Sequence, residues 1–399
     1  MGARFFEFST PTHLHFGNKV IRKLSQGLKA LSLDNIMVVT DRGIVESGLL
    51  ETVLEQLHRA STEYGVFDAV EPNPSIDTVR RGAALFREKN CNGIVAVGGG
   101  SAMDAAKAIG VVATHTGDIK DYTRQGGKPV QSSVPAIVAI PTTAGTGSEV
   151  TWVSVLSDPE KRMKIVIPSP YIAPQIAYAD PEMTRTLPPE VTAATGMDAL
   201  THAIEAYVSL KSAPISDTLA LKAVSLIGVS LREAVANGDN MEARSNMMLG
   251  STMAGLAFIN SSTGLAHSMA HALWGVFDMP HGMGNAVMLP VVMRYNQVAA
   301  PEKYRDIAAA LGEPVEGLSV REAGERGVRA VERLLADIGI SIDLGKREVE
   351  PHVIDQMAEH AMAQKGSFPF NPRRIGRTEL INLFKSTFGL LSDLGFAQK

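Results

Sequence analysis

The stretch NGIVAVGGGS, residues 92–101, decides the class of fold. Four consecutive apolar residues, Ile94–Val97, run directly into three glycines, as in a buried strand that turns sharply into a helix. Similar runs occur in NIMVVTD from Asn35 and in PAIVAIPTT from Pro135, with helical patterns between them. Uninterrupted apolar strands that alternate with helices indicate a parallel sheet with helices on both faces.

The second half of the chain has a different pattern. Beyond Pro188 the strand signals end, and stretches rich in Ala, Leu and Met with three- and four-residue periodicity continue to about Phe388. A chain of 399 residues exceeds the size at which a single core stops growing. We therefore expect an α/β domain over residues 1–187, an all-helical domain over residues 188–399, and a cleft between them.

Composition excludes several classes of protein. With 45% hydrophobic and 20% charged residues and a formal net charge of -4, the chain is ordinary globular material with no electrostatic reason to bind nucleic acid. The lone Cys91 cannot form an intramolecular disulfide, and its place just before a strand predicts a small core residue. No signal-peptide pattern and no run long enough for a bilayer is visible, so we expect a cytoplasmic protein with no membrane partner.

Two loops of the first half are suited to phosphate groups. Gly98, Gly99, Gly100 and Ser101 join a strand to a helix, where backbone N–H groups and the helix end favour an anion. A glycine triplet alone is more often only a tight turn, and this one lacks the Gly-x-Gly-x-x-Gly spacing. However, PTTAGTGSE from Pro141 repeats the arrangement with the hydroxyls of Thr142 and Thr143. Two such loops at the ends of parallel strands predict a dinucleotide crevice.

Asp41 ends the strand from Asn35 and indicates which dinucleotide is bound. A carboxylate there can accept hydrogen bonds from an adenosine ribose and repels a 2′-phosphate, which favours NAD over NADP. The alternative is that Asp41 only caps the following turn. The order also differs from a standard Rossmann unit, because Asp41 precedes the glycine loop.

Three of the ten histidines lie within GLAHSMAHALWGVFDMPHGMGN, residues 264–285. His267 and His271 are four apart and share one face of a helix, and Pro280 ends that pattern and presents His281 from a Gly-flanked turn. In GMDALTHAIEAY, residues 196–207, Asp198 and His202 are also four apart, just after a helix start at Pro188 and Pro189. One Asp-x-x-x-His is usually a surface pair, but several imidazoles in an apolar segment need a shared partner. A divalent metal would provide it.

The pairing of DALTHAIEAY with GLAHSMAHALWGVFDMPHGMGNAVMLP resembles the iron-dependent (group III) alcohol dehydrogenases, and the likeness covers nearly the whole chain. The resemblance implies that the metal ligands are Asp198, His202, His267 and His281, with His271 in the site but not ligating. It also implies dinucleotide contacts from Asp41, Asn73, Gly98, Gly99, Gly100, Ser101, Thr142, Thr143 and Lys164. One departure is Trp274, where relatives often have Gly; it lies three residues after His271 and would narrow the substrate channel.

The expected function is hydride transfer between NAD(H) and a small primary alcohol or aldehyde whose oxygen is bound by the metal. Asp and three His suit Fe2+ and Zn2+ alike, and the resemblance implies iron. His271 is either a proton relay or an imidazole that only supports the site. The alternatives are a zinc-dependent, glycerol-type polyol dehydrogenase, a lyase like dehydroquinate synthase, and, less favoured, a non-catalytic metal- or nucleotide-binding protein.

The N-terminal segment THLHFG, from Thr12, predicts assembly. It alternates apolar and polar residues and begins the chain as a potential edge strand, which invites pairing with a second subunit. Similar dehydrogenases commonly form dimers. We therefore expect a homodimer or a larger homo-oligomer.

Overall fold

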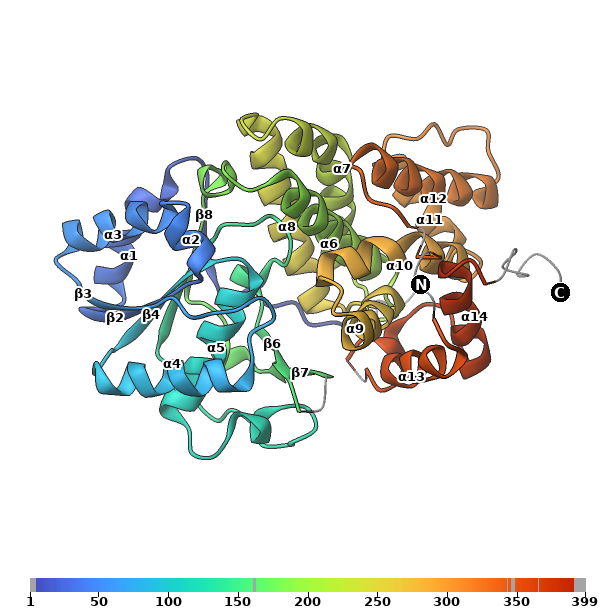
Figure 1. Cartoon of the computed structure of the whole chain (residues 1–399). Coiled ribbons are helices and arrows are strands. Elements are labelled where there is room, and N and C mark those ends of the chain that lie inside the picture. The colour runs from blue at the N-terminus through green and yellow to red at the C-terminus, as the bar shows by residue number, and fades with distance from the viewer. Residues whose placement is uncertain (1–4, 161–162, 343, 346–348, 365, 391–399) are drawn as a thin grey trace. The chain divides into compact units, whose positions relative to one another are not determined.

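The computed structural model describes residues 5–160, 163–342, 344–345, 349–364 and 366–390. The chain divides into two compact units (Figure 1). One is Thr10–Leu187, and the other runs from Pro188 onward and includes the residues before Thr10. Ser9 lies with this second unit because its backbone exchanges two hydrogen bonds, of 2.7 and 3.0 Å, with the Asn260 side chain.

The first unit is built on a parallel sheet with the strand order β1-β8-β5-β4-β2-β3. The strands are β1 (His13–Phe16), β2 (Asn35–Val39), β3 (Glu63–Phe67), β4 (Gly93–Gly98), β5 (Ala136–Pro141) and β8 (Ile176–Ala179). The predicted α/β class is confirmed, and β4 is buried along its whole length, as its apolar run predicted. The register pairs Gly98 with Pro141, so the glycine loop and the threonine loop leave the sheet at the same edge.

Helices cover both faces of this sheet (Figure 1). Alternate residues of β4 face opposite sides: Val95 and Val97 pack in one core with residues of α1 and α3, while Ile94 and Ala96 pack in another with residues of α4 and α5. These helices are α1 (Leu24–Ala30), α2 (Arg42–Glu46), α3 (Leu49–Ala60), α4 (Ile76–Glu88) and α5 (Gly100–Thr114).

An antiparallel hairpin accompanies the sheet and was not predicted. Its strands are β6 (Val153–Asp158) and β7 (Met163–Pro168), and β7 carries Lys164. The strands β3 and β8 were also not predicted.

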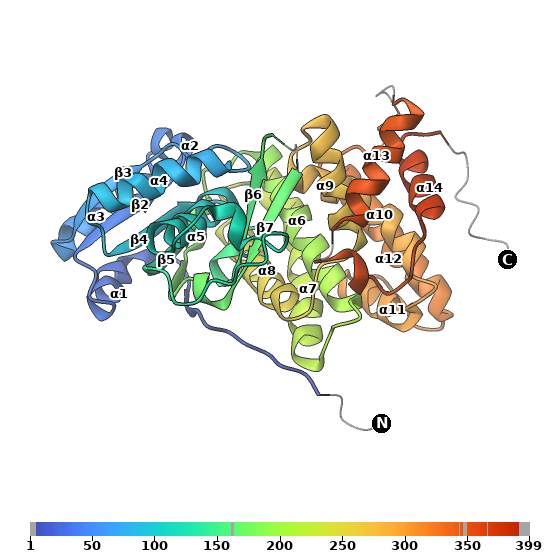
Figure 2. The ribbon, with the colours of Figure 1, turned by 90° about the horizontal axis from the view of Figure 1, so that it is seen from below.

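The second unit is helical over its described residues (Figure 2). It contains α6 (Pro189–Val208), α7 (Pro214–Ala236), α8 (Met241–Asn260), α9 (Leu265–Phe277), α10 (His281–Asn296), α11 (Pro301–Ala310), α12 (Val320–Asp337), α13 (Pro351–Met362) and α14 (Arg377–Thr387). The helix α6 begins at Pro189, as the paired prolines predicted, and most of its residues are buried. Among the described residues, none of the helices has both the length and the apolar character needed to cross a membrane.

The expected position of His281 in a turn is wrong. Asp278 and Pro280 form the break after α9, with Asp278 in the left-handed region at φ 52°, and His281 is the first residue of α10. A proline is well suited to the position before a helix, because its φ is already fixed. The backbone N–H that proline lacks is not needed for a helical hydrogen bond at that position. His281 is therefore held at the N-terminus of a helix.

Candidate metal centre and dinucleotide site

Three helices of the second unit bring three of the predicted metal ligands, Asp198, His267 and His281, into one group, and His202 lies beside Asp198 but outside that group. Asp198 and His202 lie one turn apart on α6, His267 lies in the first turn of α9, and His281 begins α10. One possible ligand atom from each of Asp198, His267 and His281 lies within 4.8 Å of the other two. The Asp198 carboxylate is the centre: its oxygens lie 3.5 Å from His281 Nε2, 3.9 Å from His267 Nε2 and 3.9 Å from His202 Nδ1.

These separations fit a shared metal ion better than hydrogen bonds. Nitrogens at 3.9 Å from a carboxylate oxygen are too far away for a hydrogen bond. Two atoms that each lie about 2.1 Å from one ion can be at most about 4.2 Å apart, so separations of 3.5 to 3.9 Å are compatible with a shared ion. Within the described residues, His202 Nδ1 and His267 Nε2 are buried and have no hydrogen-bond partner. Because leaving such groups unpaired costs free energy, the two nitrogens suit a divalent cation.

Two neighbouring residues that sequence reasoning missed support this cluster. Asn285 is fully buried, and its Nδ2 donates to Asp198 Oδ1 at 2.6 Å and lies 3.2 Å from His281 Nε2. Glu205 is buried behind His267, with its Oε2 2.6 Å from His267 Nδ1. Their spacing was a usable signal: Glu205 lies seven residues after Asp198 on α6, and Asn285 lies four after His281 on α10.

The pKa shifts favour the ligating forms of the side chains. Burial alone would raise the pKa of Asp198, but the nearby His202, His281 and His267 hold this pKa below its usual value. Burial, together with the neighbouring His202, lowers the pKa of His267 well below its usual value. Ionised carboxylate and neutral imidazole are the forms that bind a metal.

Aromatic rings surround the candidate ligands. The ring of Phe258 stacks on His202 with centroids 4.4 Å apart, and His202 and His267 are separated by the same distance. The ring of His271 lies 5.2 Å from that of His281 and is partly exposed, so the structure brings it beside the cluster. Trp274 is also partly exposed.

In the first unit, the two predicted loops are in contact. Thr142 N donates to Gly98 O at 3.0 Å. A Cβ on Gly99 would lie 3.2 Å from Thr143 Cγ2, and one on Gly100 would lie 2.6 Å from Thr146 Cγ2. Glycine is therefore required where the start of α5 meets the threonine loop.

Buried Lys107 holds the threonine loop in place. Its Nζ donates to Ser148 O at 2.8 Å, to Ser148 Oγ at 2.7 Å and to Val153 O at 2.9 Å, and it lies 3.8 Å from Asp104. Burial lowers the pKa of Lys107 to about 8, although Asp104 opposes this shift. Sequence reasoning did not identify this role, because the acceptors are 41 to 46 residues away.

A second group of predicted cofactor residues converges around Asn73. Its backbone N–H donates to Ser101 Oγ at 3.2 Å, and its Oδ1 accepts a hydrogen bond from Lys164 Nζ. Ser157 Oγ, which also accepts from Lys164, donates to Asn73 O at 3.0 Å. Asn73 adopts the left-handed conformation, at φ 58°. The turn at Pro72–Pro74 thus joins the glycine loop to the hairpin that carries Lys164.

Asp41 caps α2, but its carboxylate also lies near the glycine loop. Its Oδ1 accepts a hydrogen bond from Ile44 N at 3.1 Å. Its Oδ2 lies 3.3 Å from the position that a Cβ on Gly98 would take. Burial raises the pKa of Asp41, opposed by the backbone N–H groups of Ile44 and Gly43. The capping alternative is therefore real, and it leaves one carboxylate oxygen beside Gly98.

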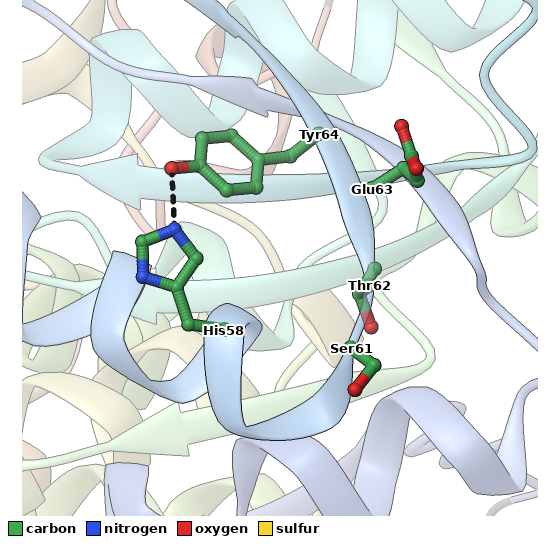
Figure 3. A pocket seen from close by; sticks show the side chains of 5 residues that line it. All are labelled: His58, Ser61, Thr62, Glu63 and Tyr64. Atoms are coloured by element: carbon green, nitrogen blue, oxygen red, sulfur yellow. Dashed lines mark hydrogen bonds between the residues drawn. The ribbon is translucent and has the colours of Figure 1, made fainter.

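A shallow surface hollow elsewhere in this unit contains none of the predicted residues (Figure 3). It is lined by His58, Ser61, Thr62, Glu63 and Tyr64, at the end of α3 and the start of β3. His58 Nε2 lies 3.0 Å from Tyr64 Oη. None of the residues that line this hollow belongs to the metal cluster or to the two loops.

A parallel sheet with two glycine-rich loops and a helical unit with an Asp/His cluster are the parts of a metal-dependent oxidoreductase that uses a dinucleotide. Comparison with known families agrees with this class. Residues 11–181 match the family model for iron-containing alcohol dehydrogenase, and residues 192–388 match that for the C-terminal part of the Fe-containing alcohol dehydrogenase family. The chain belongs to the iron-containing alcohol dehydrogenase family, which confirms the resemblance and the expectation of an enzyme.

Individual relatives are similar over nearly their whole length. The chain is 43% identical to 1,3-propanediol dehydrogenase of Klebsiella pneumoniae over 393 residues, covering 97% of this chain and 100% of that protein. It is 39% identical to an NAD-dependent methanol dehydrogenase of Bacillus methanolicus, covering 89% and 92%. Its structure is similar to a crystal structure of 1,3-propanediol oxidoreductase, with a TM-score of 0.93, 43% identity, and coverage of 96% and 100%.

Proposed function

We propose that this protein transfers hydride between NAD(H) and a small primary alcohol or aldehyde, with Asp198, His202, His267 and His281 holding a divalent metal. The main support is the buried, unpaired nitrogens of His202 and His267, which both face the Asp198 carboxylate. The names of the relatives add support, because methanol and 1,3-propanediol are short primary alcohols. Membership in an iron-containing family favours iron over zinc.

The chemistry divides between the bound groups and the protein. A divalent metal would supply Lewis acidity toward the substrate oxygen, and the nicotinamide would accept or donate the hydride. The residues of the chain hold and orient: Asp198 would bring one negative charge to the imidazoles of the ligand set, and Asn285 fixes the direction of that carboxylate by donating to Oδ1. His271, whose ring lies 5.2 Å from that of His281, carries a proton between the substrate and solvent in this proposal.

For the dinucleotide, the proposal assigns the phosphates to the loop Gly98–Ser101 and to Thr142 and Thr143. Backbone N–H groups at the start of α5 face this edge of the sheet, and a helix of 15 residues places a positive end there. Asp41 would contact the adenosine ribose and disfavour the 2′-phosphate of NADP. Lys164 and Asn73 would contact the dinucleotide as a hydrogen-bonded pair.

The polyol-dehydrogenase and lyase alternatives have less support than an alcohol dehydrogenase. The similar proteins are dehydrogenases and reductases that include a 1,3-propanediol dehydrogenase and a lactaldehyde reductase. Comparing the rates of NAD reduction with glycerol and with simple primary alcohols distinguishes a polyol dehydrogenase from an alcohol dehydrogenase.

We also propose that the enzyme forms a homodimer in the cytoplasm. The strand β1 is at the edge of the sheet and pairs with β8 on one side, which leaves its other edge available for a second subunit. Support for the location is chemical: the chain needs a pool of nicotinamide cofactor, and its lone Cys91 is a buried thiol. Light scattering tests the assembly, and a strictly monomeric mass at working concentration would contradict it.

The decisive experiment measures nicotinamide reduction by absorbance. The protein is stripped of metal, reloaded anaerobically with Fe2+ or Zn2+, and mixed with NAD and primary alcohols of increasing length. We expect turnover that depends on metal and is highest with short alcohols. His267→Ala should lose both metal, by elemental analysis, and rate. Full activity of protein shown to be metal-free would contradict the proposal.

A further inference from the structure

The buried carboxylate of Glu205 lies directly behind the ring of His267. It belongs to α6, and its side chain is 3% exposed. Its Oε2 accepts from Gly264 N at 2.8 Å and lies 2.6 Å from His267 Nδ1, while its Oε1 accepts from Ala266 N at 2.6 Å. We propose that Glu205 is a positioning residue that fixes the tautomer and direction of His267, so that Nε2 presents its lone pair to the metal.

The hydrogen bonds determine which nitrogen carries the proton. With Glu205 ionised, its carboxylate only accepts hydrogen bonds, so the contact of 2.6 Å then places the proton on His267 Nδ1. A neutral imidazole has a single N–H, so Nε2 is then the lone-pair nitrogen. Nε2 is also the nitrogen that faces Asp198, at 3.9 Å, and has no hydrogen-bond partner within the described residues. The inference therefore rests on the proposed role of His267 as a ligand.

Glu205 also fixes the place of α9 relative to α6. Gly264 N and Ala266 N lie at the start of α9, where backbone N–H groups have no partner within the helix. A Cβ on Gly264 would lie 3.0 Å from Glu205 Oε1 and 3.3 Å from its Cδ, so glycine permits this close approach. The same carboxylate thus joins the helix of His267 to the helix of Asp198 and His202.

A purely structural role is the competing explanation. A carboxylate that only capped α9 would stabilise the helix without determining the His267 tautomer. The two roles separate in Glu205→Gln, which keeps the size of the side chain. If the amide oxygen takes the place of Oε2, the NH2 group faces the N–H of Ala266. If it takes the place of Oε1, the NH2 group faces His267 Nδ1, which must then accept, and the proton moves to Nε2, where it blocks metal binding.

The experiment compares Glu205→Gln with Tyr207→Phe as a matched control. Tyr207 is also buried on α6. Its replacement by Phe removes one hydrogen bond, from Oη to Asp306 at 2.7 Å, and nearly keeps the size of the side chain. The affinity for Co2+ is measured by competition with a chelator, and the His267 tautomer is measured by 15N NMR of the metal-free protein. We expect Glu205→Gln to bind Co2+ about 10- to 100-fold more weakly, because either placement of the amide removes the charged acceptor of His267 Nδ1–H, and to shift His267 toward the Nε2–H tautomer to the extent that the NH2 group faces Nδ1. Tyr207→Phe should change neither.

Several outcomes would overturn the inference. Unchanged Co2+ affinity in Glu205→Gln overturns it, and so does an equal loss of affinity in Tyr207→Phe. If Glu205→Gln does not fold, the wild-type protein still decides, because an Nε2–H tautomer of His267 in the metal-free wild type contradicts the proposal. His267→Ala separates this failure from that of the proposed function. Unchanged affinity in His267→Ala refutes the ligand set, whereas loss there with no loss in Glu205→Gln refutes only the role of Glu205.

Discussion

The choice between NAD and NADP is expected to depend on the charge of Asp41. This residue has two roles in the structure: Oδ1 caps α2 by accepting from Ile44 N, and Oδ2 lies beside Gly98. Asp41→Asn and Asp41→Gly separate these roles. Asn caps a helix as well as Asp but has no charge, whereas Gly removes both the charge and the side-chain cap.

The magnitude follows from the charges. A carboxylate and one unit of phosphate charge about 5 Å apart repel by about 0.8 kcal/mol in a water-like medium. A 2′-phosphate carries about -1.5 to -2 at neutral pH, which gives about 1.2 to 1.7 kcal/mol, and a lower dielectric near the half-buried Asp41 raises this value. Both variants should therefore shift the ratio of kcat/KM for NAD over NADP toward NADP by about tenfold or more.

The assay is steady-state kinetics with each cofactor at saturating alcohol, together with a thermal melt. We expect Asp41→Asn to melt like the wild type and Asp41→Gly to lose only a few tenths of a kcal/mol, because Gly is itself an acceptable cap. An unchanged cofactor ratio in both variants would refute the reasoning and leave Asp41 as a capping residue alone.

Three further predictions concern other parts of the molecule. Removing the metal with a chelator should abolish turnover while the far-ultraviolet circular dichroism stays near native, because each unit has its own core; a global loss of helix would contradict this. Glu71→Gln should destabilise the protein by about 1 kcal/mol near neutral pH, since the Glu71 carboxylate accepts from Ser75 N at 2.8 Å and from Thr78 Oγ1 at 2.6 Å, which together hold its pKa below 4.5 despite burial. Because the pKa of Glu71 is lower in the folded protein than in the unfolded chain, its contribution to stability is present above about pH 4.5 and is lost as the pH falls through the folded pKa. The denaturation curves of the wild type and Glu71→Gln should therefore converge in acid. Trp274→Gly should admit longer primary alcohols with unchanged metal content, because Trp274 is partly exposed and follows His271 by three residues on α9; a variant that loses about 3 to 5 kcal/mol of stability with an unaltered chain-length profile would show that it is a core residue.

Local patterns in the sequence were sufficient for most of the architecture. The runs at Ile94–Val97 and Ala136–Ile140 predicted buried parallel strands, since a strand covered on both faces needs no polar residue along its length. The spacing of His267 and His271, and of Asp198 and His202, placed each pair on one helical face, because the helical period is a local property of the backbone.

Other features depend on contacts between distant segments. The β8 strand takes its place in the sheet by pairing with β1 and β5, which its own sequence does not record. His281 was expected in a turn, but it is the first residue of α10, with Pro280 at the N-cap.

The supports of the candidate metal site were decided in the same way. Glu205 meets Gly264 N across 59 residues and His267 across 62, and Asn285 meets Asp198 across 87. Sequence by itself therefore determined which residue types and helical faces were available for a metal. Only the tertiary structure decided which buried polar groups orient them, because helical spacing shows which residues share a face but not which groups of distant segments they meet.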